Sequence, residues 1–251
     1  MIHFVGAGPG GADLITVRGQ KLLMEADYII YAGSLVNPEH LKIAKEGCKI
    51  YDSATMTLEE VIAVMEEAES AGKMTVRLHT GDPSIYGAIR EQMDRLDPLG
   101  IPYDVVPGVS SFCGAAASLK AEYTLPEVSQ TVIITRMAGR TPVPEKEEIS
   151  LLASHQATMA IFLSTSLLEP LTERLLIGGY KKDTPAAIVY KATWPDEKIF
   201  YGTVESLPSI AKENNITKTA LILVGDFLGA EYERSKLYDP SFTHEFRKAK
   251  V

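Results

Sequence analysis

The first half of the chain alternates short apolar runs with stretches of helical periodicity, and this rhythm constrains the fold most. The apolar runs predict strands, at 2–5, 28–32, 48–52, 73–80 and 103–108. The stretches between and after them predict helices, at 16–26, 37–45, 57–72, 83–96 and 110–119. Strands that alternate with helices usually pair in parallel, because each helix carries the chain back across a face of the sheet. The first half therefore predicts a mainly parallel α/β sheet.

Several predicted helices begin with a recognisable cap. Thr57 and Glu60 have the spacing of a capping box, in which each side chain bonds the other residue's main chain. Asn37 stands before Pro38, which suits the first helical position. Thr16 is the best cap for the first helix.

The second half begins after a polar, proline-containing stretch at 120–130, which we interpret as a linker. Further strands are expected at 131–136, 158–164, 186–193, 197–204 and 219–228, with helices near 145–153 and at 167–179. The strands on either side of "WPD" are close enough to form an antiparallel hairpin, so the second sheet should be mixed. The expected organisation is two α/β domains, at 1–119 and 131–251.

Charge and composition narrow the classes of function. The 251 residues carry a net charge of −8, whereas nucleic-acid binders usually present a basic surface. No apolar run approaches the ~18 residues that span a membrane, and the first strand begins too early for a signal peptide. Cys48 and Cys113 fit free thiols in a reducing cytoplasm. The histidines show no paired metal-ligand spacing, at 3, 40, 79, 155 and 244. We therefore expect a cytoplasmic protein without a metal centre of its own.

The glycine loop "GAGPGGAD" matches a dinucleotide fingerprint through Gly6, Gly8 and Gly11. Such a fingerprint needs a tight turn from strand to helix, but the helix cap is Thr16 and Pro9 removes a backbone donor from the loop. The second strand also ends without the acidic residue that grips a ribose. These features disfavour NAD, and a merely flexible turn remains the alternative.

Other strand ends carry unusual glycine-containing loops, at 78–87, 105–118 and 135–145. Ligands of open α/β sheets bind beyond the carboxyl ends of the strands. Each loop alone has a structural explanation, since Asp82-Pro83 is an ordinary turn start and Gly114 suits close helix packing. Their joint placement predicts one ligand site.

The motifs "VGAGPGGADLITVRG", "TGDPSIYG" and "VVPGVSS", in this order, resemble the tetrapyrrole methylase family. The resemblance implies two α/β domains with a cofactor cleft between them, a homodimer, and methyl transfer from S-adenosylmethionine to an anionic tetrapyrrole. "TRMAGRTPVPE", "VYKATWPDEKI" and "RSKLYDPSFTHEFRK" resemble the branch that methylates C-11 of precorrin-4 in cobalamin synthesis, and we expect the cobalt-containing substrate rather than the metal-free one.

The resemblance also implies which residues bind the cofactor, namely Pro9, Thr80, Gly81, Asp82, Ile85, Ser110, Ser111, Leu163 and Ala192. Thr80 departs from the family, which has glycine there, and Ala192 stands where relatives often have glycine. Main-chain N–H groups of such loops can bind the methionine carboxylate, and Ile85 and Leu163 would pack on adenine.

The expected reaction needs no nucleophilic side chain, because the sulfonium is already an activated methyl donor and S-adenosylhomocysteine leaves. Positioning two bound molecules can supply ~7–11 kcal/mol of the barrier. His79 is the candidate for a base, against the alternative of a structural histidine. Arg136, Arg140 and Lys191 are the candidates for the substrate carboxylates, against the alternative of surface ion pairs.

Rival functions remain open at this point. Within the fold they are methylation of another corrin or porphyrin position, of diphthine, or of a ribosomal RNA ribose, the last disfavoured by the acidic balance. Outside it they are an NAD-dependent oxidoreductase and a non-catalytic tetrapyrrole-binding protein. The tail "THEFRK" is interpreted either as a subunit or substrate contact or as a solvated end.

Overall fold

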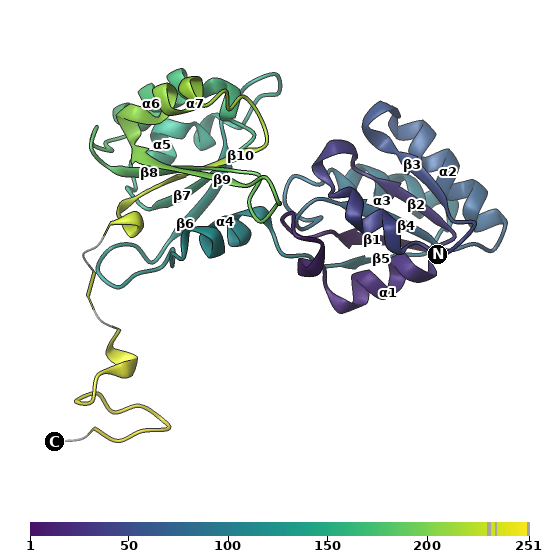
Figure 1. The fold of residues 1–251 in the computed structure, drawn as a ribbon, viewed down its shortest axis with the longest axis horizontal. Helices are drawn as coiled ribbons and strands as arrows, with labels where there is room; N and C mark the ends of the chain where they lie inside the picture. Colours follow the sequence, from purple (N-terminus) through teal and green to yellow (C-terminus); the bar gives the residue numbers. More distant parts are fainter. Residues whose placement is uncertain (230–231, 234, 250–251) are drawn as a thin grey trace. The chain divides into compact units, whose positions relative to one another are not determined.

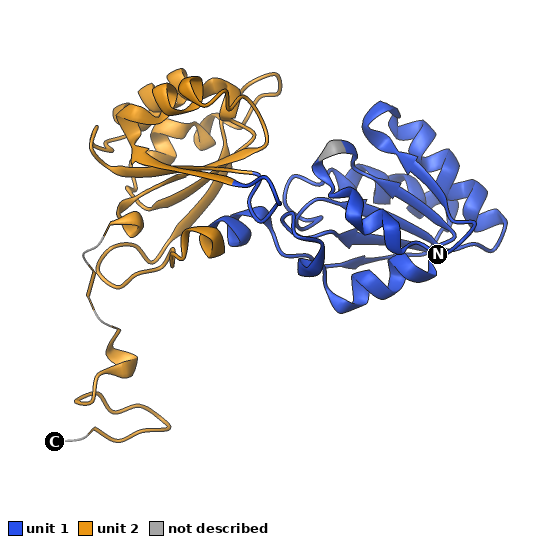
Figure 2. Cartoon of the chain, viewed as in Figure 1, with its two compact units in different colours: residues 1–115, 191–197 blue, residues 116–190, 198–251 orange. Residues whose placement is uncertain are grey.

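A computed structural model describes residues 1–229, 232–233 and 235–249, apart from the side chain of Ser34. The chain forms two compact units, one of residues 1–115 and 191–197 and the other of residues 116–190 and 198–251 (Figure 2). Whereas the sequence suggested ranges that are continuous in the chain, the short segment 191–197 is part of the first unit. In the described part, no helix is long and apolar enough to cross a membrane.

The sheet of unit 1 has five strands, β1 (Ile2–Gly6), β2 (Tyr28–Tyr31), β3 (Lys49–Asp52), β4 (Thr75–His79) and β5 (Tyr103–Val106). Their order is β3-β2-β4-β1-β5 and every pair is parallel, which confirms the predicted parallel sheet (Figure 1). Apolar side chains occupy both faces because the pleat sends alternate residues to opposite sides, so both faces need a cover.

Helices cover both faces of this sheet. Leu23 of α1 (Val17–Glu25) and Leu41 of the 3-10 helix Pro38–Ile43 pack with Val5 and Leu78 on one face. On the other face, α2 (Leu58–Ser70) and α3 (Ile89–Leu96) pack with strand residues such as Phe4 and Ile30. The predicted caps Thr16, Asn37 and Thr57 are confirmed, since each accepts a hydrogen bond from its own helix.

Two helix predictions need correction. The helix expected at 83–96 begins only at Ile89, because Tyr86 and Ala88 adopt positive φ angles of 56° and 51° that interrupt an α-helix. The stretch 37–45 forms a short 3-10 helix instead of an α-helix. A helix that is not predicted, α7 (Leu207–Glu213), has Pro208 in its first turn.

Unit 2 contains a mixed sheet, as predicted. Its strands are β6 (Val132–Arg136), β7 (Thr158–Phe162), β8 (Pro185–Tyr190), β9 (Lys198–Thr203) and β10 (Ala220–Val224). Their order is β6-β7-β10-β8-β9, and the β6–β7 pair is parallel while the other pairs are antiparallel. The β8–β9 hairpin expected around "WPD" is therefore confirmed.

One face of the second sheet carries three helices, α5 (Ile149–Ala153), α6 (Leu168–Ile177) and α7 (Figure 1). Leu171 of α6 and Leu207 of α7 are fully buried with Met159, Ile188 and Ile222 of the strands. A further helix, α4 (Ser111–Leu119), contains the boundary between the units, which falls after Ala115.

Candidate functional site

Three of the predicted loops follow strands that are neighbours in the first sheet, because β4, β1 and β5 are adjacent. The loop after β1 and the loop after β4 form a two-residue bridge. Gly8 N donates to the Gly81 carbonyl at 3.2 Å, and Gly81 N donates to the Gly8 carbonyl at 2.8 Å. Both glycines have positive φ, 82° and 60°, a conformation that favours glycine. The sheet thus gathers these loops at one edge.

Gly108, after β5, completes this junction. A Cβ on Gly108 would collide with the Gly81 carbonyl oxygen and would lie 2.8 Å from Cα of Gly6. Asp82 accepts a hydrogen bond from Gly108 N at 2.9 Å, and another from Ser84 N at 2.8 Å. Burial works against ionisation of Asp82, but the hydrogen bonds from Ser84 and Gly108 outweigh it and lower its pKa. Asp82 therefore ties the second loop to the third.

The start of α4 lies against the same junction. A Cβ on Gly81 would be 3.4 Å from Ser111 N, and Ser110 is buried. Pro9 packs on Gly114 of α4, where a Cβ would come within 2.6 Å of the proline ring. A helix N-terminus next to glycine loops presents N–H groups and a partial positive charge, which suits an anionic ligand group.

The segment 191–197 packs against the glycine loop after β1, a contact that the sequence does not predict. Trp194 Nε1 donates to the Pro9 carbonyl at 3.2 Å, and Thr193 Oγ1 accepts from Gly11 N at 2.9 Å. A Cβ on Gly10 would overlap the Trp194 indole and lie 2.7 Å from the Ala192 carbonyl oxygen. The signal for this contact in the sequence is Trp194 itself, because a tryptophan in a hairpin turn is a large apolar group that needs a partner.

Some residues in or next to these loops have strained backbone conformations. Tyr86, Ala88, Lys191 and Thr193 have positive φ angles in unit 1, and Leu163 is one of several such residues in unit 2. Such conformations cost about 1–3 kcal/mol and persist where the surroundings enforce them, often at ligand sites. Leu163 is also 65% exposed, which is unusual for a leucine directly after a buried strand.

The candidate residues fall into two groups. Unit 1 brings together most of the predicted cofactor residues, namely Pro9, Thr80, Gly81, Asp82, Ile85, Ser110, Ser111 and Ala192, with Lys191 beside them in the chain. Leu163, Arg136 and Arg140 belong to unit 2, so their part in the same site stays a prediction.

His79 ends β4 behind the glycine loops. Its side chain is 3% exposed, its Nε2 has no partner among the described residues, and its ring centroid is 6.1 Å from that of Phe4. Burial, reinforced by the charge of Arg77, lowers the pKa of His79 to about 3. A histidine this hard to protonate is a weak base, so the structure supports the structural alternative, and the catalytic role stays a prediction.

His79 should make the stability of the chain depend on acidity. Its folded pKa of about 3 lies below its ordinary 6.5, so between these values the unfolded chain binds a proton that the folded chain does not. The free energy of unfolding should therefore fall as the pH falls through this window, by up to about 1.4 kcal/mol per pH unit. Urea unfolding at several pH values should show that the free energy of unfolding of His79→Leu depends less steeply on pH than that of the wild type, by this amount. Equal slopes for wild type and His79→Leu would contradict the assignment.

The three candidate cations differ in their surroundings. The Arg136 guanidinium donates to the main-chain carbonyls of Met137, Thr141 and Pro142, so it holds its own loop together. Lys191 pairs with Asp196 at 2.6 Å and lies 5.1 Å from the Trp194 ring centroid. Arg140 is exposed at the tip of the loop that Arg136 holds, with no ion pair to any described residue.

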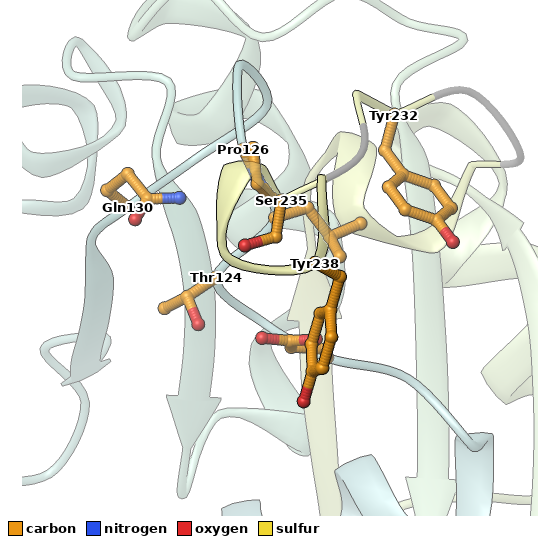
Figure 3. A pocket seen from close by; sticks show the side chains of 8 residues that line it. Thr124, Pro126, Gln130, Tyr232, Ser235 and Tyr238 are labelled. Atoms are coloured by element: carbon orange, nitrogen blue, oxygen red, sulfur yellow. The ribbon is translucent and has the colours of Figure 1, made fainter. Parts of the chain in front are cut away.

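A separate hollow of about 510 Å³ lies within unit 2, between the segment 122–130 and residues 232, 235 and 238 (Figure 3). Its lining is mostly polar and uncharged, with Thr124, Gln130, Ser235 and Tyr238 among the contributing residues. None of the predicted site residues lines it, so we do not assign the cofactor to it. Among the described residues, no group of three or more His, Cys, Asp or Glu side chains is arranged to hold a metal ion.

Comparisons with known proteins agree with the loop motifs. The family described as Tetrapyrrole (Corrin/Porphyrin) Methylases matches residues 1–208. A cobalt-precorrin-4 C(11)-methyltransferase of Methanocaldococcus jannaschii is 57% identical over 249 residues, 99% of this chain and 96% of the relative. A precorrin-4 C(11)-methyltransferase of Pseudomonas aeruginosa is 45% identical, over 98% of each chain. The X-ray structure of a cobalamin biosynthetic enzyme, cobalt precorrin-4 methyltransferase, superposes with a TM-score of 0.89 at 48% identity and covers 91% of this chain and 96% of that chain.

Proposed function

The chain belongs to the tetrapyrrole (corrin/porphyrin) methylases, and within this family we propose that it transfers methyl from S-adenosylmethionine to C-11 of cobalt-precorrin-4 in cobalamin biosynthesis. The observation that carries the proposal is the 57% identity to a cobalt-precorrin-4 C(11)-methyltransferase across 99% of the chain. The aligned range therefore covers the loops at the ends of β1, β4 and β5 as well as the strands that carry them.

The choice of the cobalt substrate follows the order of similarity. Identity is 57% to a relative named for cobalt-precorrin-4 and 45% to one named for precorrin-4. Any cobalt would be held by the nitrogens of the macrocycle and belongs to the substrate. The protein itself needs no metal ligands for this reaction.

The residues of unit 1 fit S-adenosylmethionine, which supplies an activated methyl group on its sulfonium. The main-chain N–H groups of Thr80 and Asp82 and of the start of α4 would face a carboxylate, while Gly81 N is bonded to the Gly8 carbonyl. Gly81 adopts the positive φ that this turn requires, and Ile85 would give an apolar surface for adenine. Together these groups of unit 1 would hold the methyl donor in one orientation.

Catalysis in this proposal rests on positioning. Holding donor and acceptor carbon in line can supply about 7–11 kcal/mol of the barrier. The acceptor carbon forms the new bond to methyl as the sulfur–methyl bond breaks, and S-adenosylhomocysteine leaves. The burial that lowers the pKa of His79 disfavours its taking the ring proton, so positioning carries the catalysis in this proposal.

Arg140 is the cation that we expect to bind a substrate carboxylate. Arg136 donates to Thr141 and Pro142, so it shapes the loop that presents Arg140. Arg140→Ala should raise the Kd for the tetrapyrrole about tenfold, the typical cost of one charged hydrogen-bonded pair, and leave the Kd for S-adenosylhomocysteine unchanged. Titrations with both ligands measure this, with Lys182→Ala as the control because Lys182 pairs with Glu205 on the surface of unit 2. Equal weakening of both ligands would count against the assignment.

We further infer that the active form is a cytoplasmic homodimer, as the family resemblance implies. Light scattering of the purified chain tests the assembly, with a mass of about twice 27.4 kDa expected. A monomer at working concentration would contradict the inference.

Two measurements test the proposed function against its rivals. Calorimetric titration should detect S-adenosylhomocysteine and no NADH, whereas the reverse result would favour an oxidoreductase. Transfer of labelled methyl from S-adenosylmethionine to cobalt-precorrin-4 separates an enzyme from a binding protein. Binding of both ligands without transfer would overturn the proposal.

A further inference from the structure

The main chain of the glycine loop at 7–11 accepts hydrogen bonds from side chains of two segments that are distant in sequence. Asn37, in the segment after β2, donates from Nδ2 to the Gly10 carbonyl at 2.8 Å, and this hydrogen bond is buried. Trp194, in the segment 191–197, donates from Nε1 to the Pro9 carbonyl at 3.2 Å. Consecutive carbonyls of the loop are thus fixed by separate side chains.

Both polar atoms of the Asn37 side chain make hydrogen bonds in this position. Its Oδ1 accepts from Glu39 N at 3.0 Å and caps the 3-10 helix Pro38–Ile43, so its amide is oriented with Nδ2 toward Gly10. The residue is only 6% exposed, so water cannot readily replace the bond to Gly10. His40, in the same turn, also lies next to the loop. Burial lowers the pKa of His40, and a hydrogen bond between its ring and the main chain of Ala7 partly offsets this.

Trp194 makes a corresponding contact from the other segment. The indole lies where a Cβ on Gly10 would be, so it packs directly on the loop main chain. Its neighbour Thr193 accepts from Gly11 N at 2.9 Å, although Thr193 has a φ of 67° that costs energy for a β-branched residue. A strained residue kept beside the loop indicates that the local structure enforces this contact.

We propose that Asn37 and Trp194 are positioning residues that hold main chain 7–11 in the conformation that binds S-adenosylmethionine. The inference rests on the proposed function, because it takes this loop as a wall of the cofactor site. Both residues act through the loop, because Asn37 Nδ2 donates to the Gly10 carbonyl and Trp194 Nε1 donates to the Pro9 carbonyl. They should set cofactor affinity more than the rate of the chemical step.

Two nearly isosteric changes remove these bonds. Asn37→Asp keeps an oxygen to cap Glu39 N but sets a carboxylate against the Gly10 carbonyl. Trp194→Phe keeps an aromatic ring and loses the indole donor. Each should raise the Kd for S-adenosylhomocysteine and the KM for S-adenosylmethionine about tenfold, while kcat at saturating cofactor changes less than about threefold.

The control is Thr57→Ala, which removes the capping box of α2 in the same unit. Urea unfolding should show that it destabilises the chain about as much as the loop variants do, yet its Kd for S-adenosylhomocysteine should stay at the wild-type value. An equal loss of affinity in Thr57→Ala would mean that general destabilisation explains the effect, and would overturn the proposal.

Hydrogen exchange of the free chain tests the loop without any cofactor. Amides in a peptide covering 7–14 should exchange faster in Asn37→Asp and Trp194→Phe than in Thr57→Ala. Unchanged exchange and unchanged affinity would overturn the proposal and leave the proposed function standing. If the wild type binds no S-adenosylhomocysteine, the proposed function fails and the link to affinity fails with it, while exchange still decides whether these residues hold the loop.

Discussion

Replacing Gly108 with alanine is expected to weaken cofactor binding by roughly a hundredfold. The new Cβ would overlap the Gly81 carbonyl oxygen and approach Cα of Gly6 within 2.8 Å, so the obstructing atoms are main chain and cannot rotate away. The loops after β1 and β4 would have to separate from the loop after β5. Overpacking of this kind costs about 3 kcal/mol, which corresponds to roughly a hundredfold in affinity if the loops move to accommodate it.

Calorimetry with S-adenosylhomocysteine and urea unfolding measure the two consequences of Gly108→Ala. Gly100→Ala is the control, because Gly100 has a φ of 64° but no atom within 4 Å of the added Cβ. The control should lose about 1 kcal/mol of stability from left-handed strain and keep its affinity. If Gly108→Ala binds S-adenosylhomocysteine as the wild type does, the three loops do not form the site.

Asp82→Ala is expected to have the second largest effect. The carboxylate accepts from Gly108 N and Ser84 N, so its loss leaves a main-chain donor of the neighbouring loop without its partner. Loss of the partner of this part-buried donor costs about 1–2 kcal/mol, and we expect the Kd for S-adenosylhomocysteine to rise about tenfold. Asp82→Asn should be milder because one acceptor oxygen remains.

The chain supplies a matched control for Asp82. The sequence Asp-Pro-Ser occurs at 82–84 and again at 239–241, and Asp239 also accepts from the N–H and hydroxyl of the serine two residues on. Asp239→Ala should therefore remove a similar turn and leave S-adenosylhomocysteine affinity unchanged. Equal losses in Asp82→Ala and Asp239→Ala would show that the tie to Gly108 is not what matters.

The sequence predicts both sheets well, because strand pairing follows from alternation and from the short "WPD" connection. The parallel pairing of the first sheet and the β8–β9 hairpin of the second are confirmed. Helix limits are predicted less well. Residues 83–88 do not join α3 because Tyr86 and Ala88 adopt positive φ, and Gly87 between them is a helix-breaking residue that the expected helix 83–96 did not respect.

The motifs predict the candidate site residues, but they do not predict the distant side chains that hold the loops in place. Gly81 and Asp82 are visible in "TGDPSIYG", whereas the bond from Asn37 to Gly10 joins residues 27 apart that share no local pattern. The assignment of 191–197 to unit 1 is also a tertiary effect, since Trp194 finds its partner at Pro9, 185 residues away. Contacts of this kind depend on the packed fold, which a linear pattern does not encode.

The central claim is methyl transfer to C-11 of cobalt-precorrin-4. The most direct test is incubation of the chain with cobalt-precorrin-4 and ¹³C-methyl S-adenosylmethionine, followed by NMR assignment of the labelled carbon, with metal-free precorrin-4 compared in parallel. The account predicts one new methyl group, bonded to C-11, formed faster on the cobalt substrate. Label at another ring position, or no label in product while S-adenosylhomocysteine still binds, would contradict it.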